Sequence, residues 1–166
     1  MKGDEYRDNL IFVDGYTWLT GKSEERFKIE SLSNLTELNY KITSAISTLS
    51  RPALLIFNSL SPLTLYNSET FVLKFLQLLF AKIKECGALG IFIAQSGVHN
   101  QEFYTTMEYL SDGVFDMKME EDQGNITKFF RIRSLNSVHR DTRWVPFIID
   151  SDRQIKLEYG GINQNA

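Results

Sequence analysis

The sequence has few of the features from which several classes of protein are built. One cysteine, Cys86, rules out an internal disulfide, and together with the only histidines, His99 and His139, it is too little for a usual Cys/His zinc site. The most apolar stretch, residues 71–84, is interrupted by lysines, so it is unsuited to span a bilayer. A net charge of −3 gives no overall attraction to polyphosphate. We therefore expect a cytoplasmic protein that uses no membrane, and we regard nucleic acid as an unlikely partner.

The length and composition favour one domain. With 166 residues, of which 43% are hydrophobic, the chain can bury one substantial core. It contains no internal repeat, low-complexity tract or linker. We therefore predict a single domain over residues 1–166.

The tripeptide Gly21-Lys22-Ser23 matches the end of a phosphate-binding loop, but its surroundings do not. That loop requires a glycine where this chain has Tyr16, and small residues where residues 17–19 are bulky. The acidic segment 24–30 follows, which is unfavourable for holding a polyphosphate. We interpret the tripeptide as a turn after a strand, with a solvated lysine.

The first two thirds of the chain predict alternating strands and helices. Apolar runs predict strands, and apolar residues recurring at three and four predict helices. Ser33 or Asn34 can cap the first helix, which ends before Pro52, and Gly87 ends the second. The expected strands are residues 9–16, 53–60 and 88–95, and the expected helices are residues 34–51, 67–86 and 100–111.

The last third predicts strands alone. Four candidates are separated by turn residues at 123–125 and 151–153. Together the two patterns predict an α/β fold with a mostly parallel sheet flanked by helices, extended by a C-terminal antiparallel β-meander. The four strand candidates are residues 112–120, 126–135, 145–150 and 155–159.

Four blocks in order resemble the archaeal KaiC-like group of RecA-fold ATPases. They are ALLIFNSLSPL, LGIFIAQSGVH, LSDGVFDMKMEEDQGNITKFFRIRSL and HRDTRWVPFIID, within a resemblance that runs from about residue 9 to 159. The resemblance implies a RecA-like fold. In that family a strand, the phosphate loop with its helix, and a strand ending in catalytic glutamates come first, and this chain is expected to begin after them. Met1 and the polar tail 160–166 nevertheless suit a complete small protein.

The resemblance also identifies vestigial nucleotide-site positions after two strands. Asn58 stands where the family has an aspartate that orients Mg²⁺, and its uncharged amide would bind this hard cation poorly. Ser59 and Ser61 match the family pattern, although serines are also common turn residues. Gln95 and Ser96 occupy a position where a polar side chain can sense the γ-phosphate, or can be ordinary loop residues.

Near the meander the family carries a lysine and an arginine that reach the neighbouring subunit's ATP. Ser134 and Asn136 stand at these positions, so the stabilising charge would be missing. A register one residue earlier would place Arg133 and Leu135 there, which still loses one charge. His139 matches a histidine that often follows this segment, and it can equally be a surface side chain.

These replacements indicate a non-catalytic relative with no catalytic residues, metal or cofactor. We expect an interaction or regulatory subunit that self-associates or docks on a full-length KaiC-like ATPase. One alternative is an ATP- and Mg-binding ATPase that uses Lys22 or a site shared between chains. Another is a recombinase-paralogue-like nucleic-acid binder that uses the loop 96–102 and the basic residues between 131 and 143.

The absence of the family's first strands also predicts a gap in the sheet. Unpaired backbone groups at a buried edge would each cost about 1–3 kcal/mol. Either residues 88–95 pair directly with residues 112–119, or another chain supplies or covers the missing edge. The wide apolar stripe of the 67–86 helix favours such a partner.

Overall fold

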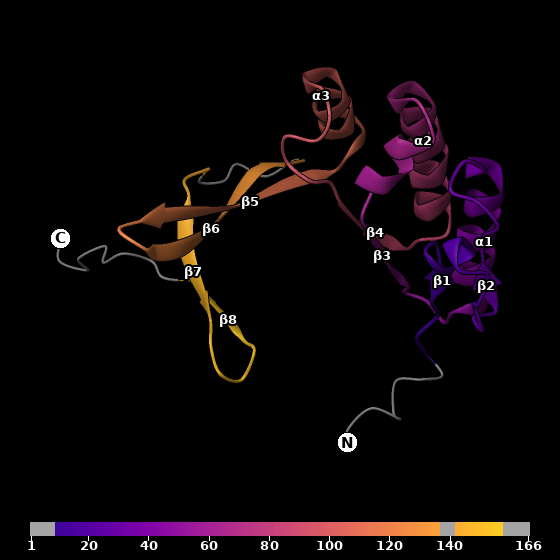
Figure 1. Ribbon diagram of the computed structural model, residues 1–166, viewed down its shortest axis with the longest axis horizontal. Helices are drawn as coiled ribbons and strands as arrows, with labels where there is room; N and C mark the ends of the chain where they lie inside the picture. Colours follow the sequence, from indigo (N-terminus) through magenta and orange to yellow (C-terminus); the bar gives the residue numbers. More distant parts are fainter. Residues whose placement is uncertain (1–8, 137–141, 158–166) are drawn as a thin grey trace. The chain divides into compact units, whose positions relative to one another are not determined.

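The computed structural model describes residues 9–136 and 142–157. The chain forms two compact units, which meet in the sequence between Leu110 and Ser111 (Figure 1). Each unit is described by itself. Compact units of this kind also occur within one domain, so the single domain expected over residues 1–166 stays a prediction.

The strands of the first unit form two parallel pairs. Strand β1 (Val13–Asp14) pairs with β2 (Phe27–Lys28), and β3 (Leu54–Asn58) pairs with β4 (Leu89–Ile93). The predicted strand over residues 9–16 was therefore too long, and β2 was not predicted. Strand β1 stops early because its last residue, Asp14, binds the turn that follows, as described below.

Three α-helices complete the first unit, and their bounds agree closely with the apolar periodicity. They are α1 (Leu35–Thr48), α2 (Glu69–Glu85) and α3 (Gln101–Leu110). The Asn34 side chain accepts from the Glu37 N–H at 3.0 Å, which confirms the predicted cap. Gly87 has a φ of +62°, which confirms the predicted helix end. Two short 3₁₀ helices, Thr17–Leu19 and Ser61–Leu65, were not predicted.

The core of this unit lies between the helices and one face of the β3–β4 pair. Helix α2 buries five apolar residues in it, namely Val72, Phe75, Leu76, Leu79 and Ile83. Both strands pack against this core, β3 through Leu55 and Phe57 and β4 through Phe92. The Phe80 and Phe92 rings are in contact, with 4.6 Å between their centroids. The wide stripe of α2 is thus largely covered within the chain, although Phe71 and Leu78 are exposed.

The opposite face of the β3–β4 pair is apolar and exposed. In both strands every second residue points away from the core, and these residues pair side by side as Leu54 with Leu89, Ile56 with Ile91 and Asn58 with Ile93. The five aliphatic members of this set are 42–64% exposed. We call these six residues the outer face.

The second unit is the predicted antiparallel meander, with the strands in chain order. It comprises β5 (Gly113–Asp122), β6 (Asn125–Leu135), β7 (Val145–Ile149) and β8 (Ile155–Leu157). Gln123 and Gly124, at φ of 47° and 81°, form the tight turn between β5 and β6. Within each unit β4 pairs with β3 and β5 pairs with β6. Pairing of residues 88–95 with 112–119, one of the two alternatives for the expected gap, would join the two units and stays a prediction.

Candidate functional site

The turn after β1 is organised around the carboxylate of Asp14. Its Oδ1 accepts from the backbone N–H groups of Tyr16 and Thr17 at 2.9 and 3.0 Å. Its Oδ2 accepts from the hydroxyl groups of Thr17 and Ser23. The donors that follow this strand therefore converge on a negative group of the chain itself.

These hydrogen bonds keep Asp14 ionised. The Ser23 hydroxyl, then the Thr17 hydroxyl and the backbone N–H groups of Thr17 and Tyr16, hold the pKa of this carboxyl well below its usual range. Lys22 is exposed, and Gly21 takes a φ of +66° in the turn. The N–H groups that could bind a phosphate are engaged by Asp14, and the negative charge of Asp14 would repel a phosphate. This geometry agrees with the expected turn and solvated lysine.

The positions predicted after β3 and β4 lie together. Asn58 pairs in register with Ile93, and the Leu60 N–H donates to the Ile93 carbonyl at 2.8 Å. The Gln95 N–H donates to the Ser61 hydroxyl oxygen at 3.2 Å, which ties the two loops together. Ligands of α/β proteins bind at such carboxyl ends of parallel strands. The structure thus brings Asn58 and Ser59 near the loop that holds Gln95 and Ser96.

A cluster of polar side chains lies between these loops, and its Ser61 and His99 are buried. The Ser61 hydroxyl is 3.0 Å from His99 Nε2, and His99 Nδ1 is 3.4 Å from Glu69 Oε1. The Glu69 carboxylate also accepts from the backbone and side-chain nitrogens of Asn100. The His99 ring stacks on Phe103, with 4.3 Å between ring centroids. These contacts join the loop after β3, the first turn of α2 and the start of α3.

The same cluster has the spacing of a serine hydrolase relay, but it is closed to substrate. Ser61 and His99 are only 5% and 8% exposed, and the Ser61 hydroxyl already binds the Gln95 N–H. Nearby, the Tyr104 hydroxyl donates to the Gln95 carbonyl at 2.5 Å and accepts from the Val98 and His99 N–H groups. We therefore interpret the cluster as a structural latch. Ser61 and His99 are 38 positions apart in the sequence, and this separation left no sequence signal of their contact.

The predicted positions in the meander are part of its strand pairing. Ser134 lies opposite Val114 in the β5–β6 ladder. The Asn136 backbone N–H donates to the Asp112 carbonyl at 2.8 Å, and its side-chain amide lies 3.4 Å from the Asp112 carboxylate. His139 lies outside the described residues. Neither Ser134 nor Asn136 supplies the positive charge that the family's segment carries.

Two arginines of the meander are held by one carboxylate. Asp116 Oδ2 accepts from Arg131 Nε at 2.7 Å and from Arg133 Nε at 2.8 Å. Burial raises the pKa of Asp116, but the hydrogen bonds and charges of Arg133 and Arg131 outweigh this effect and leave the pKa lowered. Arg131 and Lys118 also lie 4.4 Å from the centroid of the Trp144 ring. These contacts favour a structural role over nucleic-acid binding for the arginines.

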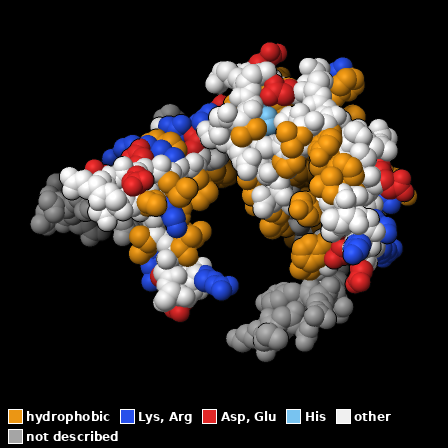
Figure 2. Space-filling view, viewed as in Figure 1, with side chains coloured by type: hydrophobic (Ala, Val, Ile, Leu, Met, Phe, Trp, Pro, Cys, Tyr) orange, Lys and Arg blue, Asp and Glu red, His pale blue; other side chains and the backbone are white. Residues whose placement is uncertain are grey.

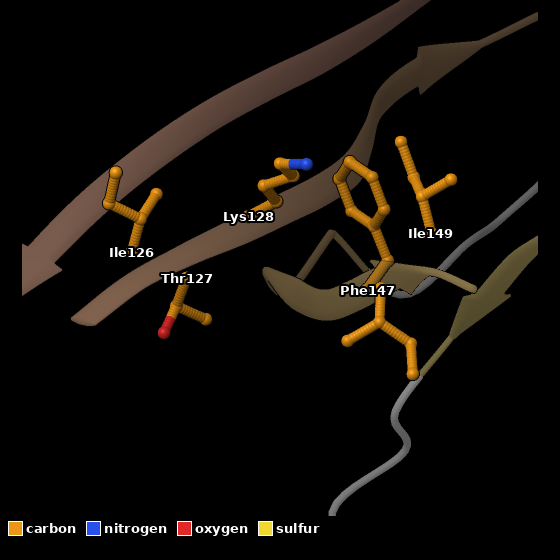
Figure 3. A pocket seen from close by; sticks show the side chains of 6 residues that line it. Ile126, Thr127, Lys128, Phe147 and Ile149 are labelled. Atoms are coloured by element: carbon orange, nitrogen blue, oxygen red, sulfur yellow. The ribbon is translucent and has the colours of Figure 1, made fainter. Parts of the chain in front are cut away.

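A shallow hollow of about 260 Å³ lies where β6 and β7 diverge (Figure 3). Its lining mixes isoleucines and Phe147 with the polar Thr127 and Lys128, and it contains no carboxylate or histidine. Across residues 9–136 and 142–157, no group of three His, Cys, Asp or Glu side chains is placed to hold a metal. The hollow therefore offers little to orient a ligand. The residues that line it are Ile126, Thr127, Lys128, Phe147, Ile148 and Ile149.

Comparisons with known proteins agree with this arrangement. The family described as "ATPase: KaiC" matches residues 2–159. The chain belongs to the KaiC ATPase family. The crystal structure of a KaiC-like protein from the hyperthermophilic archaeon Pyrococcus horikoshii OT3 superposes with a TM-score of 0.63 at 17% sequence identity. This match shows a shared RecA-like α/β fold.

The chain is shorter than this solved relative. The match covers 75% of the present chain but only 54% of the P. horikoshii protein. No curated protein matches the sequence. None of the helices in the described part of the chain is long and apolar enough to cross a membrane.

Proposed function

We propose that this KaiC-family chain is a non-catalytic, cytoplasmic interaction or regulatory subunit, which associates with a KaiC-like ATPase or with itself. The observation that carries the proposal is the Asp14 carboxylate, which collects four donors beside Gly21-Lys22-Ser23. A phosphate-binding loop works because its backbone N–H groups are free to surround an anion. Here the ionised Asp14 carboxylate stands in the place of that anion. Its negative charge would repel a polyphosphate.

Replacements at the other strand ends support the same proposal. Asn58 offers an uncharged amide where Mg²⁺ requires a carboxylate. Ser134 and Asn136 offer no positive charge to a transferring phosphoryl group. Ser61 and His99 bind each other and are buried. Asn58, Ser134 and Asn136 thus lack the charge that phosphoryl transfer uses, and the Ser61 and His99 side chains are already engaged with each other.

Titration calorimetry with Mg-ATP, together with a phosphate-release assay, tests the proposal. We expect no binding tighter than about 1 mM and no turnover above the buffer blank. The variant Lys22→Ala should behave as the wild type in both assays. Micromolar affinity, or turnover abolished by Lys22→Ala, would instead establish the ATP-binding alternative.

A further inference from the structure

We draw no further inference here: the strongest candidate, the exposed apolar outer face of the β3–β4 pair (Figure 2), carries none because nothing in the structure shows what covers it.

Discussion

The turn after β1 and the loops after β3 and β4 solve the same problem by different means. Each must satisfy polar groups at the carboxyl end of a parallel strand. After β1 a single side chain, Asp14, accepts from donors no more than nine residues away. After β3 and β4 the contacts join residues 30 or more positions apart, through Ser61, His99 and Glu69.

The difference shows two ways in which polar residues at the carboxyl ends of strands can be satisfied. After β1 the nearby donors bind the Asp14 carboxylate, which places a negative charge within the turn. After β3 and β4 the side chains of Ser61, His99 and Glu69 form a latch between the loops. This latch fixes the carboxyl ends of the two strands and leaves Ser61 and His99 buried. After β1 every donor of the turn that reaches Asp14 is engaged within the protein, whereas in the second region His99 Nδ1 is buried without a hydrogen bond.

The largest expected effect comes from the latch. His99→Ala removes a buried ring, its stacking on Phe103 and its hydrogen bond to Ser61, so we expect it to lower the free energy of unfolding by about 2–4 kcal/mol. Urea titration followed by circular dichroism measures this loss. The conservative variant His99→Asn should recover part of it.

A double-mutant cycle shows whether the latch acts as one unit. His99→Ala, Ser61→Ala and the double variant should give a coupling of about 0.5–3 kcal/mol. Additive losses would contradict a direct interaction between the two side chains. The comparison between the latch and the Asp14 turn would then lose its basis.

The Asp14 turn should matter somewhat less. Asp14→Ala leaves two backbone N–H groups and two hydroxyls without their acceptor, and we expect a loss of about 1–3 kcal/mol near pH 7. The lowered pKa of Asp14 means that its stabilising contribution is complete above the unfolded value of about 3.9 and fades as the pH falls through the folded value. The gap between wild type and variant should therefore narrow below about pH 4.

Urea titrations of both proteins between pH 2 and 7 measure that gap. Asp14→Asn, which keeps an oxygen acceptor without the charge, serves as the control and should fall between the two. A gap that widens on acidification would show that the turn is not held by an ionised carboxylate.

In the meander one carboxylate again collects its donors, and here the effect should be smaller still. Asp116→Ala removes the acceptor of Arg131 and Arg133, with an expected loss of about 1 kcal/mol. Glu120→Ala breaks the more exposed pair with Lys118 and should change stability by no more than about 0.5 kcal/mol. The fluorescence of Trp144 in a Trp18→Phe background reports on this unit. Equal effects of the two variants would contradict a special role for Asp116.

The smallest effect is expected at Lys22. Its side chain is exposed, so Lys22→Ala should leave the unfolding free energy within about 0.5 kcal/mol of wild type. Thermal and urea unfolding both measure this. A larger loss would mean that the lysine contributes to the turn around Asp14.

The sequence predicted features that depend on nearby residues. The helix caps at Asn34 and Gly87, the helices over most of their length and the meander turns follow from periodicity and turn chemistry. Asp14 follows an apolar run and precedes Thr17 and Ser23, so an Asx-type turn could have been recognised there. Instead, the run was extended into a strand over residues 9–16.

The latch and the strand pairing could not be predicted in this way. Nothing within ten residues of His99 indicates Ser61 or Glu69 as its neighbours, because the contact depends on how β3 and β4 pair. The two-residue β2 has too little periodicity to be seen. Pairing of residues 88–95 with 112–119 would join the two units and stays a prediction.

The open edges of the β3–β4 pair have a practical consequence. Within the described part of the first unit each of these strands is hydrogen-bonded on one side only, beside the apolar outer face. Such a ribbon can recruit any extended chain it meets at high concentration. The purified protein should therefore lose dispersed material faster as its concentration rises.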